Sequence, residues 1–417
     1  MKRLYIYLIM CVVLNFLQAR DTLIYIGKFE PSDVVLRDGW VVGDIGYLTW
    51  EHYPDSFGIF IIDLTDRTNP SKISHLRIPS FPYSIEVHDS LAYVAADDGL
   101  YIINVKNPEN PQLIGSLLAG HMFDLEIVDT ICYVCNFIPP PSLYVINIKD
   151  PSSPSLITTY TPSFVPDYWY LKYYNDILFA TEGIYPRLHS IDVSNPQNPV
   201  FLDTLWVPMP SPPGYRDIQS IDIFPPYVYC GTDAGMWIVD VSNPSHLISL
   251  VLMDSIRGEG AIFIRDSLLF RAVGPSVWKI IPDPIHPVEI ANCHWLFYGQ
   301  RLFVDPLYYV YHIGYYTDPY PWHIYQLQQV GIKEGKNQEE YFDVKIDKRK
   351  VRIFYNLLVP QYGEIYVIDK TGRILDFLKK GIIKNGEILY EIKSPGIYFV
   401  VLEKKDKILK KMINIIK

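Results

Sequence analysis

The sequence has 417 residues and a net charge of −9, and its 33 prolines and 33 tyrosines suit many short strands joined by tight turns. Its length gives room for one large domain and one small one. The charge is uneven, because residues 341–417 carry a balance of +8 and the remainder carries −17. The basic side chains of the tail lie between strand-like runs, so they indicate solvated strand faces and argue against a nucleic-acid partner.

Residues 1–19, MKRLYIYLIMCVVLNFLQA, begin with Lys2 and Arg3, continue as an apolar run and end at Ala19. This order predicts a signal peptide, because the run is too short and wrongly flanked for a membrane span. Cys11 is a poor lipoprotein site, since Met10 before it is not small. We therefore expect a secreted or cell-surface protein of a Gram-negative-type bacterium, with no membrane span in the mature chain.

A strand followed by a turn, most often Asn-Pro or Asp-Pro, recurs seven times between Gly58 and Leu327. Equivalent positions are 41 to 48 residues apart, which is the length of a four-stranded propeller blade. The copies begin at Gly58, Gly99, Ser142, Arg187 and Gly235, with weaker copies at Ser276 and Pro321. The repeat predicts an all-β, seven-bladed propeller over residues 20–328.

A β-hairpin is expected upstream of most copies, as in YSIEVHDSLAYVAA from Tyr83. Alternating apolar residues flank a two-residue polar turn such as Asp89-Ser90, which is a hairpin signature. Proline ends the downstream strand because it has no N–H for a ladder. The Asn or Asp before it can cap the turn with its side chain.

The phrases at residues 99–111 and 187–199 closely resemble the LVIVD-repeat family of bacterial β-propellers. This resemblance implies a seven-bladed ring or a close relative, and no agreed activity. The segment TLIYIGKFEP from Thr22 matches the outer strand PQLIGSLL from Pro111. We expect this N-terminal strand, near residues 24–29, to complete the last blade and leave no open edge.

Residues 329–340 form a charged linker, and residues 341–417 no longer repeat. The tail resembles the C-terminal sorting domain of type IX secretion substrates, a small immunoglobulin-like β-sandwich. Asp369, Gly372 and Arg373 match its Asp-x-x-Gly-Arg turn, and Gly396 and Tyr398 match its Gly-x-Tyr strand. The resemblance implies recognition by outer-membrane secretion machinery. A related sandwich of flagellar-hook and bacterial surface proteins shares the same turn and is the alternative.

Sequence motifs for catalysis, metals or cofactors are missing: the sequence contains no Gly-x-Ser-x-Gly, no His-Glu-x-x-His and no phosphate-binding glycine loop. Cys132 and Cys135 form a C-x-x-C within a strand, where residues i and i+3 point to opposite faces. We expect them to be small buried side chains. The sequence therefore predicts no catalytic residues, no metal and no cofactor.

Carboxylates are expected to gather at one mouth of the central channel. Aligning the upstream strands places five acidic residues there: Asp33, Glu86, Asp124, Glu126 and Asp222. Such a group could bind a cation or a polyhydroxylated ligand. The plainer interpretation is a set of hydrated strand termini around a water-filled hole, whose removal would cost little stability.

Aromatic residues are dense between Trp295 and Tyr325, and the loop with Tyr315, Tyr316 and Tyr320 is the expected contact surface. Two classes of function then remain. The first is an exported, non-catalytic binding or scaffolding propeller with a glycan or surface-protein ligand. The second is an extracellular glycan-active hydrolase or lyase that uses channel-mouth carboxylates. The first is preferred, because no nucleophile or acid/base pair can be named.

Overall fold

A computed structural model of the chain describes residues 22–136, 142–161, 168–182, 186–208, 218–232, 235–253, 260–272, 275–280, 283–292, 299–314, 321–328, 341–347, 350–369, 374–391, 396–404 and 407–415. The chain divides into two compact units, residues 1–330 and 331–417. The expected signal peptide and linker both lie outside the described residues.

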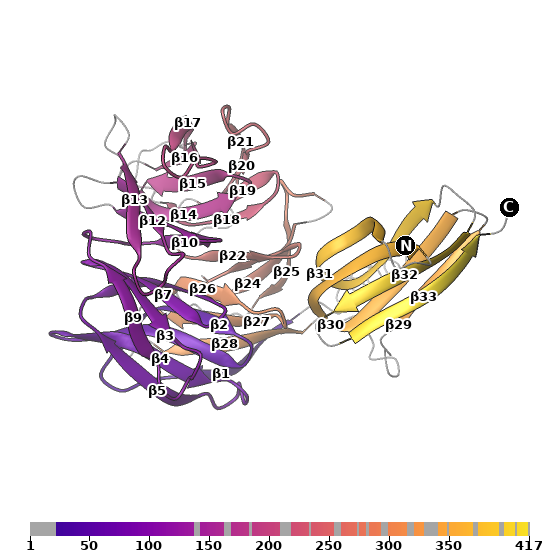
Figure 1. Cartoon of the computed structure of the whole chain (residues 1–417). Helices are drawn as coiled ribbons and strands as arrows, with labels where there is room; N and C mark the ends of the chain where they lie inside the picture. Colours follow the sequence, from indigo (N-terminus) through magenta and orange to yellow (C-terminus); the bar gives the residue numbers. More distant parts are fainter. Residues whose placement is uncertain are drawn as a thin grey trace, which may run out of the picture. The chain divides into compact units, whose positions relative to one another are not determined.

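The described part of the first unit contains seven four-stranded antiparallel sheets, and in six of them the strands pair in chain order. In Figure 1 the fourth strands, such as β5, β9 and β13, lie at the rim, and the first strands lie toward the middle. The first three sheets are β2 (Val35–Val42), β3 (Ile45–His52), β4 (Ser56–Asp63) and β5 (Ser71–Ile78); β6 (Pro82–His88), β7 (Leu91–Ala96), β8 (Gly99–Asn104) and β9 (Gln112–Leu117); and β10 (Leu125–Val128), β11 (Ile131–Asn136), β12 (Ser142–Asn147) and β13 (Ser155–Tyr160).

The next three sheets have the same order. They are β14 (Tyr168–Tyr174), β15 (Ile177–Glu182), β16 (Arg187–Asp192) and β17 (Val200–Trp206); β18 (Ile218–Phe224), β19 (Tyr227–Thr232), β20 (Gly235–Asp240) and β21 (Ile248–Met253); and β22 (Ile262–Arg265), β23 (Leu268–Arg271), β24 (Ser276–Lys279) and β25 (Val288–Asn292). We call β2, β6, β10, β14, β18, β22 and β26 the inner strands.

The last sheet combines the two ends of the first unit. It contains β26 (Gly299–Val304), β27 (Tyr309–Gly314) and β28 (Trp322–Gln328), and its fourth strand is β1 (Thr22–Phe29), which pairs antiparallel with β28. The strand order β1-β28-β27-β26 confirms that the N-terminal strand completes the last sheet. Its outer edge is therefore formed by residues about 300 positions away in sequence.

Turn residues take the conformations that the sequence signals require. Asp89, Asp129, Asn175 and Asp266 begin the hairpin turns with φ between 50° and 56°, a left-handed conformation that Asn and Asp tolerate better than most residues. In five repeat turns the Asn or Asp before the proline accepts, through a side-chain oxygen, a hydrogen bond from the backbone N–H two residues later; these residues are Asn107, Asp150, Asn195, Asn243 and Asp283. The predicted capping of the repeat turn is confirmed.

Apolar cores lie between neighbouring sheets. One core combines Ile59 and Ile61 of β4 with Ile85 of β6 and Val94 of β7. Cys132 packs into the core shared with the preceding sheet, and Cys135 packs into the core shared with the following one. Both are buried free thiols, as expected for i and i+3 positions of one strand.

The second unit contains one five-stranded antiparallel sheet among its described residues. Its strands are β29 (Tyr341–Asp347), β30 (Lys350–Asp369), β31 (Ile374–Glu391), β32 (Gly396–Lys404) and β33 (Lys407–Ile415), in the order β29-β30-β32-β33 with β31 also on β30. β30 pairs with β29 through its first half and with β32 through its second half. Alternate residues of β30, such as Val351, Ile353, Ile365 and Val367, are fully buried.

Candidate functional site

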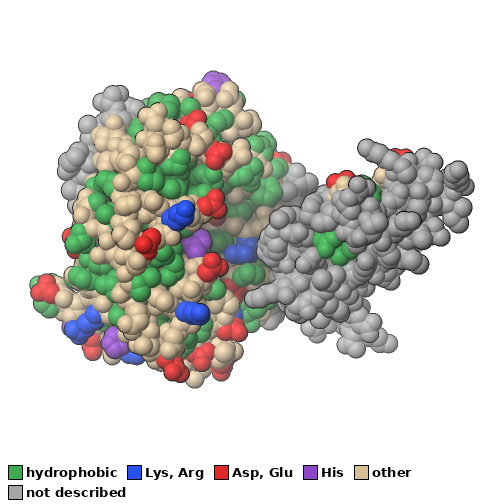
Figure 2. Space-filling view, in the orientation of Figure 1, with side chains coloured by type: hydrophobic (Ala, Val, Ile, Leu, Met, Phe, Trp, Pro, Cys, Tyr) green, Lys and Arg blue, Asp and Glu red, His purple; other side chains and the backbone are tan. Residues whose placement is uncertain are grey.

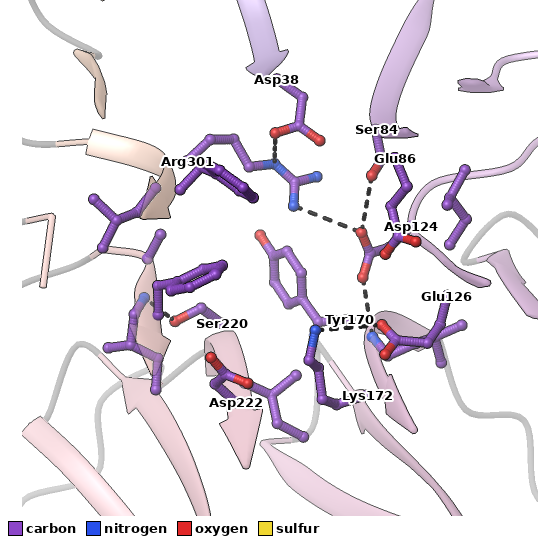
Figure 3. A pocket seen from close by; sticks show the side chains of 18 of the residues that line it. Asp38, Ser84, Glu86, Asp124, Glu126, Tyr170, Lys172, Ser220, Asp222 and Arg301 are labelled. Carbon is purple, nitrogen blue, oxygen red and sulfur yellow. Dashed lines mark hydrogen bonds and ion pairs between the residues drawn. The ribbon is translucent and has the colours of Figure 1, made fainter. Parts of the chain in front are cut away.

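One pocket lies where the seven inner strands meet, and its volume is about 110 Å³. Two layers of side chains line it, and every inner strand or the residue just before it supplies one member of each layer (Figure 3). The first layer is Asp38, Ser84, Asp124, Tyr170, Ser220, Ala261 and Arg301. The second layer, two residues further along each strand, is Trp40, Glu86, Glu126, Lys172, Asp222, Phe263 and Phe303.

Four of the five acidic residues that the sequence placed at the channel line this pocket: Glu86, Asp124, Glu126 and Asp222. Asp33 does not. It is an exposed residue with φ 64° in the turn before β2, and Asp38 takes the expected place. The sequence alignment therefore placed the first strand five residues too early.

Sequence reasoning also missed Arg301, although a simple signal identifies it. Each first-layer residue stands five positions before the first residue of its two-residue hairpin turn, as Ser84 stands before Asp89 and Asp124 before Asp129. The same count from Gly43 gives Asp38, and from Pro306 it gives Arg301. The position of the hairpin turn therefore identifies the first-layer residues more reliably than the alternation of the inner strand.

The pocket carboxylates hold neighbouring sheets together. An inner strand is the edge of its sheet, so the N–H groups on its open side have no ladder partner. Asp38 Oδ2 accepts a hydrogen bond from Ile85 N–H of the next sheet at 3.0 Å, and Asp124 Oδ2 accepts one from Leu171 N–H at the same distance. Carboxylates of the second layer make equivalent hydrogen bonds to the next sheet. Asp222 Oδ2 accepts one from Ile264 N–H, and Glu126 Oε1 accepts one from Tyr173 N–H.

Arg301 neutralises part of the first layer. Its guanidinium lies 3.7 Å from Asp38 Oδ1 and 3.6 Å from Asp124 Oδ1, and Figure 3 shows it between these two carboxylates. Its central carbon lies 5.5 Å from the centre of the Tyr170 ring. Although burial opposes its charge, Asp38 and Asp124 raise the pKa of Arg301 above its ordinary value. Arg301 is therefore a permanent cation of the pocket.

Lys172 is the only cation of the second layer, and its Nζ lies 3.4 Å from Glu126 Oε2. Burial opposes the charge of Lys172, but Glu126, Asp222 and Glu86 together raise its pKa. Burial also raises the pKa of Glu126 to about 8, and Lys172 offsets this only in part. These tendencies compete, because a protonated Glu126 cannot attract the ammonium. Because Asp222 and Glu86 also raise the pKa of Lys172, the lysine keeps its charge whether Glu126 is protonated or ionised.

Burial overturns the expectation of hydrated carboxylates. Glu86 and Asp222 are each 8 % exposed. Burial raises the pKa of Asp38 and of Asp222 as well, because the charged form loses water. Five carboxylates share the pocket with the two cations Lys172 and Arg301, so negative charge exceeds positive charge when all of these groups are ionised.

An aromatic wall faces these charges across the second layer. Trp40, Phe263 and Phe303 come from the last two sheets and the first, and the carboxylates and Lys172 come from the four sheets between. The rings of Trp40 and Phe303 have centroids 4.8 Å apart, and those of Phe263 and Phe303 are 5.3 Å apart. Within the second layer, one side is thus apolar and the other carries three carboxylates and Lys172.

The other candidate residues are not among those that line the pocket. Tyr315, Tyr316 and Tyr320 are outside the described residues, as are Gly372 and Arg373 of the tail. Asp369 ends β30 and pairs with Tyr398 of β32, and Gly396 begins β32.

The visible face of the first unit carries charged side chains of both signs scattered among hydrophobic ones (Figure 2).

The described part of the chain contains neither a metal-binding cluster nor a membrane-spanning helix. Its His, Cys, Asp and Glu side chains form no group of three or more that could hold a metal ion. The described residues also contain no helix with the length and apolar character that crossing a bilayer requires.

Repeated four-stranded sheets around a shared axial pocket define a propeller-type repeat protein. A family model described as the LVIVD repeat matches residues 83–119, which span β6 to β9, and residues 215–254, which span β18 to β21. No curated protein matches the chain.

Solved structures resemble the fold at low identity. Sqt1 from Saccharomyces cerevisiae is 8 % identical with a TM-score of 0.51, and the match covers 74 % of this chain and 100 % of Sqt1. The computationally designed Ika8 protein is 12 % identical with a TM-score of 0.49, covering 94 % of this chain and 100 % of Ika8. At such identity the likeness to Sqt1 concerns the fold alone.

Proposed function

We propose that this chain is a seven-bladed, non-catalytic binding propeller that is exported and reaches the bacterial cell surface through its C-terminal unit. One observation carries the binding role: all seven inner strands direct side chains into one small axial pocket. The carboxylates there are fixed by backbone N–H groups of the next sheet, as Asp38 is by Ile85. Such fixed positions support a preformed binding site.

The small volume of the pocket favours a binding function over the alternative of a hydrolase. Its volume of about 110 Å³ is below the ~300–1,000 Å³ of common small-molecule sites. A glycosidase needs two carboxylates that flank a sugar linkage, whereas a pocket of this size suits one small group of a ligand. The fixed carboxylates favour recognition of such a group over chemistry on a glycan.

A screen of the mature chain, residues 20–417, tests the binding role. The protein is applied to arrays of glycans and peptides, and hits are repeated with Glu86→Gln and with Glu109→Gln, an exposed control outside the pocket. Saturable binding that only Glu86→Gln weakens supports the proposal. Release of reducing sugar from a glycan, lost in Glu126→Gln, would show the hydrolase instead.

The export role concerns the second unit. Its strands β29 and β33 touch without pairing, at opposite ends of the strand order, which supports a sheet folded over into the two layers of an immunoglobulin-like sandwich. The matches of Asp369 and Tyr398 to the type IX sorting domain support recognition by outer-membrane secretion machinery.

Truncation and transfer test that recognition in a host with the type IX machinery. Deleting residues 341–417 should leave a folded propeller in the periplasm, and fusing these residues to an exported reporter should bring the reporter to the surface. Normal surface display of the truncated chain would reject the sorting role and favour a structural or adhesive sandwich.

A further inference from the structure

The second layer of the pocket has an excess of buried acceptors. Lys172 is the one cation of this layer opposite Glu86, Glu126 and Asp222, and Arg265 outside the layer adds a smaller attraction to Asp222. Burial without full pairing is unfavourable for a carboxylate. The raised pKa of Glu126 is in keeping with this imbalance, since a proton takes the place of a missing positive charge.

Two polar atoms in the pocket still have capacity for a ligand. Glu86 Oε2 contacts His88 Nε2 at 2.9 Å and accepts from Ile127 N–H at 3.4 Å. The other oxygen, Oε1, accepts no hydrogen bond from the part of the chain that the structure describes. The Tyr170 hydroxyl likewise has no hydrogen bond to the described residues, and in Figure 3 it points toward the middle of the pocket.

The opposite wall has the chemistry that attracts a cation without a charge of its own. Trp40, Phe263 and Phe303 contribute three neighbouring rings. An ammonium group near an aromatic face is attracted by the ring quadrupole, and its alkyl part gains apolar contact. A hydrated metal ion would gain little from such a wall.

From this arrangement we propose that the pocket binds an alkylammonium group, with its charge toward Glu86 and its alkyl part against Trp40, Phe263 and Phe303. The inference rests on the proposed binding function and specifies its ligand. The group can come from a small free amine or from a lysine side chain of a peptide. A volume of about 110 Å³ admits one such group.

Isothermal titration calorimetry of the mature chain, residues 20–417, tests the assignment at pH 8. The probes are n-butylammonium, Nα-acetyl-lysine amide, 1-butanol as the neutral isostere, and calcium chloride. The variants are Glu86→Gln, which removes charge with little change of shape, and Phe263→Leu, which removes one ring. Glu109→Gln is the matched control, because Glu109 is an exposed turn residue outside the pocket. Circular dichroism confirms that each variant is folded.

We expect saturable binding of both ammonium probes, and no binding of 1-butanol or calcium. Glu86→Gln should weaken ammonium binding about tenfold or more, since a charge-assisted hydrogen bond is lost. Phe263→Leu should weaken it roughly threefold, and Glu109→Gln should leave it unchanged. Tighter binding of the lysine derivative than of butylammonium would identify a peptide as the source.

Equal affinity for 1-butanol, or ammonium binding that neither Glu86→Gln nor Phe263→Leu weakens, would overturn the assignment. Failure of the inference is distinct from failure of the proposed function. If the amines do not bind but an array ligand is lost in Glu86→Gln, the pocket binds another chemical class and only the inference falls. If neither the amines nor any array ligand depends on Glu86, both fall.

Discussion

Arg67 and Asp305 are 238 residues apart in sequence, yet Arg67 Nη2 lies 3.2 Å from Asp305 Oδ2. Arg67 follows β4 in the first sheet, and Asp305 follows β26 in the last. The Tyr311 hydroxyl donates to Asp305 Oδ2 at 3.0 Å and accepts from Arg67 Nε at 2.8 Å. Both charged side chains are nearly buried, with 9 % and 3 % exposed. The contact therefore fastens the first sheet to the last.

Asp305→Ala should lower the free energy of unfolding by about 3 kcal/mol, because it leaves Arg67 buried beside a lost partner. Thermal and urea unfolding measure this. Asp44→Ala is the matched control: Asp44 contacts the same arginine at 2.9 Å but is 58 % exposed, so its loss should cost less than about 1 kcal/mol. Equal effects of the two variants would contradict the role of Asp305.

Gly27→Ala should destabilise the first unit by about 1–3 kcal/mol, because there is no room for a side chain. A Cβ at this position of β1 would lie 2.6 Å from the carbonyl oxygen of Arg67 in the first sheet. Gly115 is equivalent in β9, where a Cβ would lie 2.0 Å from the Pro151 carbonyl oxygen of the following sheet. Melting temperatures of both variants should fall together, whereas Ile24→Ala on the same strand should have little effect.

Asp222→Ala should destabilise the chain by about 1–3 kcal/mol, contrary to the expectation of a solvated channel. The carboxylate accepts hydrogen bonds from Ile223 N–H and Ile264 N–H, and alanine would leave the Ile264 N–H of the next sheet unpaired. Asp222→Asn keeps an acceptor and should cost less. Urea unfolding distinguishes the two variants, and an alanine variant as stable as wild type would show that water replaces the carboxylate.

The contribution of Glu126 to stability should fall from pH 5 to pH 9, and Glu126→Gln should remove this contribution. Burial raises the pKa of Glu126 from 4.5 to about 8, so between these values the folded state binds more protons than the unfolded state. The contribution is fully present below pH 4.5 and is lost as pH rises through 8, by up to about 1.4 kcal/mol per pH unit. Melting temperatures across this range provide the measurement. If the melting temperatures of the variant and the wild type changed equally with pH, the role of Glu126 would be contradicted.

Acid should destabilise the last sheet through His312 and His323, which pair across β27 and β28. Burial lowers the pKa of His312 to about 3 and that of His323 to about 4. Below pH 6.5 the unfolded chain binds protons that the folded chain excludes, so stability is lost as pH falls. At pH 5 the loss from His312 is about 2 kcal/mol.

His312→Phe should therefore be more acid-resistant than wild type, as judged by melting temperatures at pH 7 and pH 5. His246→Phe, a substitution at an exposed turn histidine, is the control and should leave the pH dependence unchanged. An equal response of both variants would assign the acid sensitivity to other groups.

Local signals in the sequence determined most of the strand pattern. The polar pair Asp89-Ser90 and the alternation around it predicted the β6–β7 hairpin, because both depend on residues close in the chain. The strand near Ile24 was predicted to complete the last blade by its likeness to the outer strand that contains Gly115. The common backbone contact of Gly27 and Gly115 explains the likeness.

The pocket was only partly predictable, because its charges come from different sheets. Glu86 and Asp124 were found because they precede the polar hairpin turns at Asp89 and Asp129, whereas Asp38 was missed because its strand was aligned five residues too early. Arg301 was missed because Pro306-Leu307 is not a polar turn signal. That Arg301 would lie between Asp38 and Asp124 depends on three strands meeting at the axis, which no local pattern encodes.

The pairing of β1 with β28 also determines when folding can finish. Thr22 is synthesised about 300 residues before its partner Gln328. Until that residue is made, the first strand has no partner and the ring cannot close. Contacts so distant in sequence form late and slow folding, so a chain that stops short of β28 leaves unpaired strands open to aggregation.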